Sequence, residues 1–185
     1  ILTIFEKRVD PEDIPFFIDL HNHLSENNFA CPIPIKNKDD NVIDFLKSKK
    51  AIIISFLEGE KINSPNPSIC EEVGTMVAKL HTITKSFNKS RKNSLGLKKW
   101  REIYNSFSNI KEHKFLNIIK SIDDELYFLE KNWPNNLPSG IIHGDLFKDN
   151  IFFQNNNLSG VIDFYFSCKD FYAYELAITI NAWCF

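Results

Sequence analysis

The chain has 185 residues, 43% of them hydrophobic, and its 22 Lys and Arg nearly balance 24 Asp and Glu, for a formal net charge of -2. This length can bury one sizeable core or two small lobes. The charge balance excludes the strongly basic surface of a nucleic-acid-binding protein, and no apolar run is long enough to span a bilayer. Since the sequence has no signal peptide, we expect a cytoplasmic protein without nucleic-acid or membrane partners.

Residues 1–58 have the pattern of a small antiparallel sheet with one helix. At the start, apolar residues alternate with Thr3 and then with charged residues, which is typical of a strand. Asp10 and Pro11 predict a helix start, with Asp10 as N-cap and Asp13 returning to it in a capping box. Further strands are expected at residues 33–35, 42–46 and 51–57.

Residues 59–185 are predicted to be mainly helical. Ser68 and Glu71 have the spacing of a capping box, and the apolar residues after them recur at helical spacing. This pattern indicates a helix that packs on a core. The next expected elements are a polar, solvated loop and two helices, at residues 86–97, 98–107 and 111–131.

The final segment, residues 170–185, is apolar on nearly every side and predicts a buried helix with Asp170 as its N-cap. Glu175 is the charged residue within this apolar helix. Because a buried carboxylate requires a partner, we expect Glu175 to brace the loop that contains His143.

An Asp and an Asn lie five residues apart, at Asp145 and Asn150, and a second Asp, Asp163, ends the next predicted strand. This arrangement is typical of kinase-type phosphoryl transfer, which aims a hydroxyl at a γ-phosphate and holds Mg²⁺ on the phosphate oxygens. Asp145 suits the general base that orients the hydroxyl and takes its proton. Asn150 and Asp163 offer the oxygen ligands that Mg²⁺ prefers.

The residues around this motif predict the geometry that it requires. Residues 151–162 have the pattern of a β-hairpin with a polar turn at 154–157, which brings Asp163 back beside Asn150. A loop histidine next to glycine packs and hydrogen-bonds to the backbone more often than it titrates in a reaction. We therefore interpret His143 as structural.

The runs Ile142–Asn150 and Gly160–Cys168 resemble the small-molecule kinases of the aminoglycoside phosphotransferase type. Within that group, Asp163–Cys168, Asn181–Cys184 and Leu2–Asp10 are most similar to the bacterial homoserine kinases. The resemblance implies ATP and Mg²⁺ as cofactors, with Asp145 as catalytic base and Asn150 and Asp163 as metal ligands. It also implies L-homoserine as the acceptor, a step of threonine biosynthesis.

The resemblance further implies an α+β, protein-kinase-like fold with two lobes. Residues 1–58 would be part of the N-terminal lobe, on the nucleotide side, and residues 59–185 part of the C-terminal lobe, with the catalytic hairpin. Kinases of this group are longer at both ends, so the chain is interpreted as a fragment that lacks both. The phosphate-covering loop would precede Ile1 and part of the acceptor pocket would follow Phe185. By itself, the 185-residue chain is therefore expected to be inactive.

The nucleotide contacts are also implied by the resemblance. The hinge that meets adenine through backbone groups falls on Ser55, Phe56 and Leu57, although a simple strand end is an equally good local interpretation. Kinases pair a strand lysine with the phosphates and with a helix glutamate, and that position here is Thr3. The candidates for the missing positive charge are Lys7, Arg8 and Lys148.

Two alternatives remain open. One keeps the chemistry and changes the acceptor to an aminoglycoside, a choline-like compound or a sugar alcohol, although the run Phe164–Phe166 followed by Lys169 and Asp170 favours a smaller acceptor. The other is a non-catalytic, pseudokinase-type binding module, which Thr3 and the missing phosphate loop would explain. The presence of all three residues of the motif argues against that module.

Overall fold

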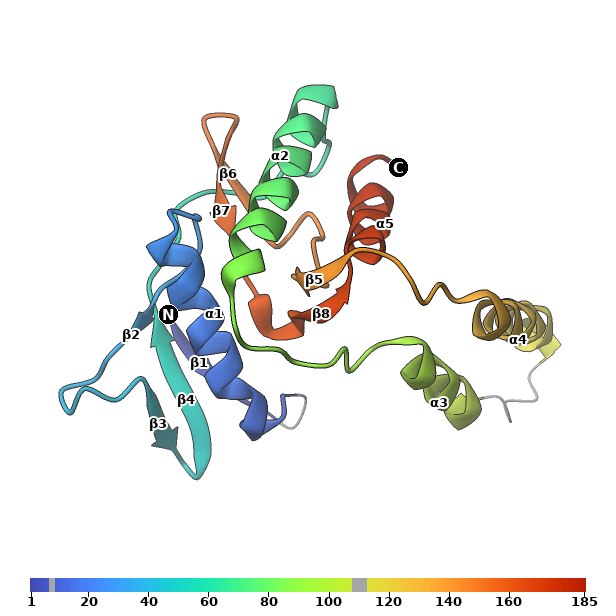
Figure 1. Ribbon diagram of the computed structural model, residues 1–185, viewed down its shortest axis with the longest axis horizontal. Helices are drawn as coiled ribbons and strands as arrows, with labels where there is room; N and C mark the ends of the chain where they lie inside the picture. The colour runs from blue at the N-terminus through green and yellow to red at the C-terminus, as the bar shows by residue number, and fades with distance from the viewer. Residues whose placement is uncertain (7–8, 108–112) are drawn as a thin grey trace. The chain divides into compact units, whose positions relative to one another are not determined.

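The computed structural model describes residues 1–6, 9–107 and 113–185 (Figure 1). They form two compact units, one of residues 1–92 and 138–185 and the other of residues 93–137. The predicted lobe boundary at residue 58 falls inside the first unit and remains a prediction. Helices alternate with small antiparallel sheets, which confirms the predicted α+β class. Among the described residues, no helix is long and apolar enough to cross a membrane.

The first unit opens with a small four-stranded sheet. Its central strand β4 (Lys49–Ile54) pairs antiparallel with β1 (Leu2–Ile4), β2 (Pro34–Ile35) and β3 (Ile43–Leu46). The strands lie close to their predicted positions with two differences. The alternation at the start of the chain predicted a strand over residues 1–9, whereas β1 ends at Ile4, and β4 leaves residues 55–57 outside it. Two candidate cations, Lys7 and Arg8, lie outside the described residues.

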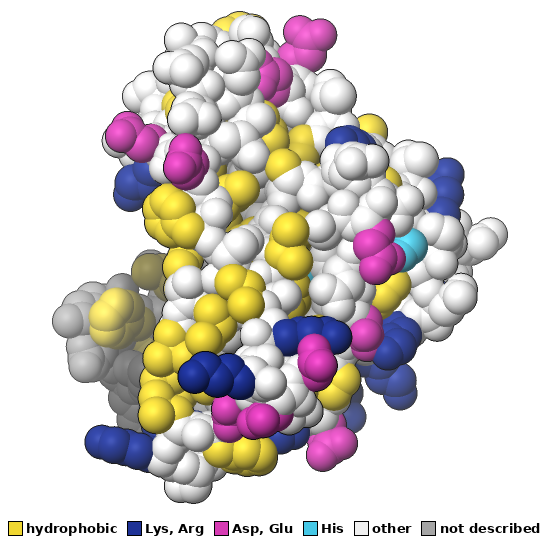
Figure 2. Space-filling model, turned by 90° about the vertical axis from the view of Figure 1, so that its left-hand side faces the viewer, with side chains coloured by type: hydrophobic (Ala, Val, Ile, Leu, Met, Phe, Trp, Pro, Cys, Tyr) yellow, Lys and Arg dark blue, Asp and Glu magenta, His cyan; other side chains and the backbone are white. Residues whose placement is uncertain are grey.

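Helix α1 (Ile14–Glu26) lies on one face of this sheet (Figure 1). Ile14 and Ile18 pack with Ile52 and with neighbouring apolar side chains in one buried cluster. On the other face, Leu2 and its cross-strand neighbour Ile53 expose 55% and 47% of their surface. Hydrophobic side chains accordingly gather on this side of the molecule (Figure 2). The core of the sheet therefore lies on its α1 side.

The start of α1 differs from the prediction in one respect. Asp10 caps the 3-10 turn η1 (Pro11–Asp13), because its carboxylate accepts the N–H of Glu12 at 3.0 Å. The predicted capping box is wrong, since the carboxylate of Asp13 does not return to Asp10 but forms an ion pair with Arg91. That partner lies 78 residues away in sequence, beyond the reach of any local pattern.

Helix α2 (Pro67–Ile83) begins at a different cap from the one predicted. Asn66 is the N-cap, and its side-chain oxygen accepts the N–H of Ile69 at 2.9 Å. Pro67 explains the shift, because proline favours the first helical position and leaves Ser68 inside the helix. The apolar stripe is buried as predicted, at Ile69, Val73, Met76, Val77 and Leu80. A short 3-10 turn, η2 (Thr84–Ser86), follows.

Two strand pairs complete the first unit. Strands β6 (Ile151–Gln154) and β7 (Asn157–Val161) form the predicted hairpin. Strand β5 (Ser139–Ile142) pairs antiparallel with β8 (Cys168–Phe171), a strand that the local sequence pattern did not indicate. The loop that contains His143, residues 143–150, connects β5 to β6, so each of these strands holds one end of the loop.

Two predictions about helix α5 (Tyr172–Trp183) were wrong. Asp170 lies within β8 and not at the N-cap position, which Phe171 occupies. The helix is buried on one face, and Leu176 and Ile180 on the other expose 46% and 49% of their surface. Apolar composition alone does not separate a buried face from an exposed one, which explains the second error.

The second unit is a pair of helices, α3 (Leu97–Phe107) and α4 (His113–Asn132), close to the predicted positions. The start of the longer helix was predicted at residue 111, which lies outside the described residues. Arg101 joins the two helices, since its guanidinium donates to the carboxylates of Asp123 and Glu130. On α4, Leu126 is buried, whereas Ile118 is 55% exposed.

Candidate active site

Asp145 and Asn150 lie on the loop between β5 and β6 and contact each other. The side-chain amide of Asn150 donates to the backbone carbonyl of Asp145 at 2.8 Å and to its carboxylate Oδ2 at 2.9 Å. Asn150 is 7% exposed, so the surroundings hold this amide in place. The loop therefore fixes the candidate base against the candidate metal ligand.

These two hydrogen bonds also settle which way the Asn150 amide points. Both partners are acceptors, so the atom that faces them is the nitrogen, and the amide oxygen is directed elsewhere. An outward amide oxygen fits a hard cation such as Mg²⁺. Among the described residues, no group of three or more His, Cys, Asp and Glu forms a protein-only metal site. A metal held by one amide, one carboxylate and phosphate oxygens requires no such group.

Asp163 follows β7 and comes back to the same loop. The N–H of Ile162 donates to the backbone carbonyl of Asn150 at 2.9 Å, which places the two predicted metal ligands on adjacent stretches of backbone. Asp163 has a left-handed backbone, with φ 61° and ψ 56°. This conformation is uncommon outside glycine, though Asp tolerates it better than most residues, and it is concentrated at functional sites. The hairpin thus brings Asp163 back beside Asn150, as predicted.

The surroundings of Asp145 change the pKa of its carboxyl group. Burial raises the pKa of the Asp145 carboxyl above its ordinary value, and the carboxylates of Asp163 and Asp149 act in the same direction. The hydrogen bond from Asn150 opposes the rise. A carboxylate with a raised pKa accepts a proton more readily, which suits the role of a general base.

His143 has the structural role that was predicted. Its ring is fully buried, Nε2 lies 2.9 Å from the carbonyl of Ile162, and Nδ1 accepts the N–H of Asp145 at 3.2 Å. These partners define a neutral ring with its proton on Nε2. Burial lowers the pKa of His143, in agreement with that neutral form. The ring therefore ties the start of the loop to the end of the β6–β7 hairpin.

Glu175 has the partner that its burial required. Its Oε1 accepts the N–H of Gly144 at 2.8 Å, so Glu175 braces this loop as expected. Its Oε2 lies 2.8 Å from Nε2 of His81 on α2, a contact that sequence reasoning missed. Gly144 has φ 80°, and a Cβ there would approach the carbonyl oxygen of Phe166 to 3.2 Å. Glycine is therefore required at this bend.

Trp183, also on α5, is a second support that was missed. Its indole N–H donates to the backbone carbonyl of Leu146 at 2.9 Å, and the side chain is 3% exposed. Together with Glu175, it binds the backbone on either side of Asp145 from a single helix. The signal that could have revealed it is an indole in a buried helix, which requires an acceptor for its N–H.

Nothing in the structure tests the four predicted nucleotide contacts. Ser55 uses its N–H and its hydroxyl to bind the backbone of Ile33, and Phe56 is 71% exposed. Lys148 lies near Cys70, where its charge favours the thiolate. The roles of Ser55, Phe56, Leu57 and Lys148 toward ATP remain predictions.

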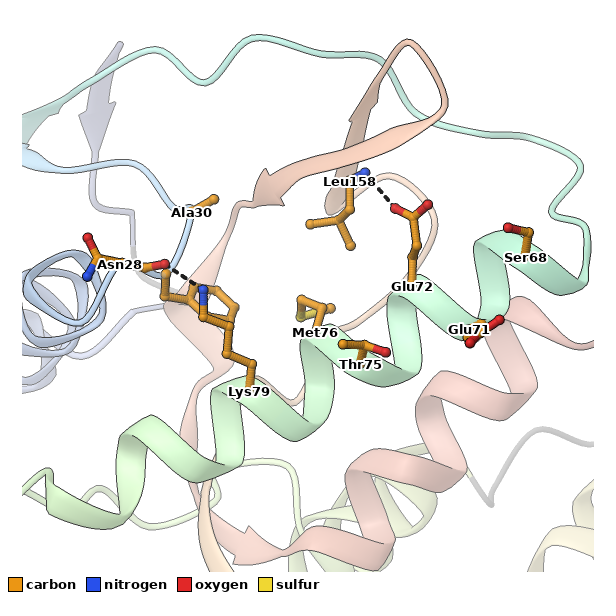
Figure 3. A pocket seen from close by; sticks show the side chains of 10 residues that line it. Asn28, Ala30, Ser68, Glu71, Glu72, Thr75, Met76, Lys79 and Leu158 are labelled. Carbon is orange, nitrogen blue, oxygen red and sulfur yellow. Dashed lines mark hydrogen bonds between the residues drawn. The ribbon is translucent and has the colours of Figure 1, made fainter.

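A cavity of about 400 Å³ lies elsewhere, between α2, the end of the β6–β7 turn and the segment after α1 (Figure 3). Glu72 on its wall accepts the N–H of Leu158 at 2.7 Å, and Lys79 donates to the carbonyl of Asn28 at 2.6 Å. These contacts attach the hairpin and α1 to α2. The cavity contains none of the predicted site residues.

The chain belongs to the phosphotransferase enzyme family (APH), whose family model matches residues 1–185. It is 48% identical over 185 residues to the homoserine kinase of Bartonella tribocorum (strain CIP 105476 / IBS 506). It is 47% identical to the homoserine kinase of Bartonella henselae (strain ATCC 49882 / DSM 28221 / CCUG 30454 / Houston 1). Each match covers 100% of this chain and 58% of the relative, so the chain spans little more than half the length of these curated relatives.

Solved structures confirm the fold class. The fold is similar to that of the amicoumacin kinase hAmiN in complex with AMP-PNP, Ca²⁺ and Ami, with a TM-score of 0.75 and 14% sequence identity. That match covers 98% of this chain and 56% of the kinase chain.

Proposed function

We propose that this chain carries the catalytic loop and the metal ligands of an ATP-dependent kinase that phosphorylates the side-chain hydroxyl of L-homoserine, a step of threonine biosynthesis in the cytoplasm. The observation that carries the proposal is the pair of hydrogen bonds from Asn150 to Asp145, with Asp163 beside them across the hairpin. The homoserine kinases that the chain resembles at 48% and 47% identity support this choice of acceptor.

In this mechanism, Asp145 acts on the acceptor hydroxyl. Its carboxylate accepts a hydrogen bond from the hydroxyl, aims the oxygen at the γ-phosphorus and takes the proton as the new O–P bond forms. The bond from the γ-phosphorus to the bridging oxygen breaks, and ADP leaves. Asn150 donates to the Asp145 carboxylate, and the Asp145 backbone N–H donates to Nδ1 of His143. These two bonds hold the carboxylate in one orientation, so little reorganisation is required during the reaction.

Asn150 and Asp163 would hold Mg²⁺ through the amide oxygen and the carboxylate. When bound, the metal neutralises charge on the phosphate oxygens. Asn150 would then serve both functions, because its nitrogen donates to the base and its oxygen would be a ligand of the metal. The backbone of residues 55–57 would receive adenine, and Lys148 would supply positive charge near the phosphates.

The proposal is tested with the intact protein by measuring ADP release with ATP, Mg²⁺ and a panel of hydroxyl acceptors. We expect L-homoserine to be the preferred acceptor, and we expect Asp145→Asn to abolish most of this activity. Asp149→Asn is the matched control, because Asp149 is an exposed acid on the same loop. Preference for an aminoglycoside, a choline-like compound or a sugar alcohol would keep the reaction class and overturn the acceptor. No acceptor-dependent ADP release would overturn the kinase itself.

A further inference from the structure

Protein kinases couple the helix of the small lobe to the active site through an ion pair between a strand lysine and a helix glutamate. The resemblance places Thr3 at that strand position, which would leave this chain without the pair. The corresponding helix, α1, nevertheless has a partly buried ion pair at its N-terminus, between Asp13 and Arg91. Arg91 comes from the loop that follows η2, a loop that sequence patterns described as solvated.

Arg91 makes three kinds of contact at once. Its Nε donates to Oδ2 of Asp13 at 2.5 Å, its Nη1 donates to the backbone carbonyl of Ser167 at 3.2 Å, and its Cζ lies 5.2 Å from the centre of the Phe17 ring. The Arg91 side chain is 10% exposed and that of Asp13 is 29% exposed. A shielded, charge-assisted contact of this kind is stronger than an ordinary surface ion pair.

Ser167 connects this contact to Asp163. Residues 164–166 form the 3-10 turn η3, with Asp163 at its N-cap position and Ser167 at its C-cap position. The N–H of Ser167 closes the turn on the carbonyl of Phe164 at 2.9 Å. Ser167 is fully buried, and its hydroxyl donates to the carbonyl of His143 at 3.4 Å. A group that holds Ser167 therefore holds the far end of the turn that presents Asp163.

The backbone of Arg91 supports the same segment. Its carbonyl accepts the N–H of Lys169 at 2.7 Å, at the start of β8. Residues of α1 reach the turn independently, because the rings of Phe17 and Tyr165 lie 5.5 Å apart edge to face. The side chain and the backbone of Arg91 thus join α1 on one side to η3 and β8 on the other.

We propose that Arg91 is a positioning residue that fixes the Asp163 turn to α1, and that the Arg91–Asp13 pair takes over the coupling for which other kinases use the strand lysine and the helix glutamate. The inference rests on the proposed role of Asp163 as a metal ligand. A planar guanidinium is needed, because it reaches a carboxylate and a carbonyl from two different nitrogens, whereas a lysine has one compact ammonium.

The test compares the affinity of the intact protein for Mg²⁺·ATP with its affinity for ATP in EDTA. Loss of a residue that supports a metal ligand typically lowers metal affinity about tenfold or more. We expect Arg91→Ala and Asp13→Ala each to weaken Mg²⁺·ATP about tenfold and to leave metal-free ATP within about twofold. The double variant should lose little more than either single one, because both remove the same coupling. Arg91→Lys should recover part of the loss.

The matched control is Lys89→Ala. Lys89 lies on the same loop and forms an ion pair with Asp19 on the same helix, but the side chains are 56% and 35% exposed. This variant should bind both forms of ATP as the parent does. The proposal is overturned if Arg91→Ala and Asp13→Ala bind Mg²⁺·ATP like the parent, or if both lose the two forms of ATP equally, which is the result of a general structural defect. Binding is measured without acceptor, so a parent protein that binds Mg²⁺·ATP but phosphorylates no hydroxyl would overturn the proposed function alone.

Discussion

The carboxylate of Glu175 binds the backbone N–H of Gly144, the residue immediately before Asp145, at 2.8 Å. Its other oxygen contacts His81, and the Glu175 side chain is fully buried. A buried charge is retained only where it is paired and hydrogen-bonded. Glu175 meets both conditions through the Gly144 N–H and His81, and the bond to Gly144 also fixes the backbone of the loop next to Asp145.

Glu175→Ala should destabilise the protein and displace the loop. It leaves the Gly144 N–H and His81 without their buried acceptor, and breaking such a pair costs about 3 kcal/mol. Glu175→Gln keeps an oxygen for Gly144 and should cost less. Chemical denaturation and kcat measured on both variants check this order. Equal losses in the two variants would show that the hydrogen bond to Gly144 contributes little.

Asp145→Asn should lower kcat by about a hundred- to ten-thousandfold while nucleotide affinity stays near that of the parent. The substitution removes proton acceptance and keeps the shape of the side chain. Steady-state kinetics and nucleotide titration together provide the measurement. Near-normal turnover would exclude Asp145 as the base.

The raised pKa of Asp145 also predicts the pH dependence of the reaction. The base acts as a carboxylate, so kcat/KM should fall as the pH drops through the pKa of Asp145. Because burial raises that pKa, the fall should begin at a higher pH than for an ordinary aspartate. A pH–rate profile measures the position of this limb. An acid limb at or below the ordinary aspartate range would contradict the assignment.

Asp163→Ala should weaken Mg²⁺·ATP far more than metal-free ATP, since the carboxylate that is proposed to hold the metal is removed. Calorimetric titrations with and without Mg²⁺ distinguish the two. Asp170→Ala is a useful comparison, because Asp170 is an acid on β8 in the following segment. If the two variants bind Mg²⁺·ATP equally well, the ligand role belongs elsewhere.

Acid should destabilise the protein through His21. This side chain is 2% exposed on α1, its Nδ1 contacts the carbonyl of Pro32 at 2.6 Å, and burial lowers its pKa from 6.5 to about 4. The folded state therefore favours the neutral ring, while the unfolded chain binds a proton below pH 6.5. Stability should fall between pH 6.5 and about 4, by up to about 3 kcal/mol.

Urea denaturation across this pH range checks the prediction. His21→Met removes the titrating ring and should flatten the profile, although His143, which is also buried with a lowered pKa, keeps part of the slope. An unchanged slope in His21→Met would show that His21 does not control the acid limb.

Local patterns in the sequence were enough to predict the β6–β7 hairpin and the three residues of the motif. Asp145, Asn150 and Asp163 lie within one short stretch of chain, and alternation with a polar turn determines how such a stretch folds back on itself. The helices were predicted for the same reason, since their spacing is a local property. Caps at Ser68 and Asp170 were predicted wrongly, because each depends on which of several nearby groups accepts the hydrogen bond. The capping-box role of Asp13 was wrong because its partner, Arg91, is distant in the sequence.

Glu175 is the one distant support that the sequence suggested, and tertiary structure decided the other contacts that hold the motif in place. Trp183 binds Leu146 across 37 residues, and Arg91 binds Asp13 across 78. The pairing of β5 with β8 likewise joins segments on either side of the catalytic hairpin. Such contacts follow from the packing of whole elements against a shared core, and no periodicity or spacing along the chain encodes them. The proposed chemistry of the site was therefore visible in the sequence, whereas most of the supports that orient it became visible only in the fold.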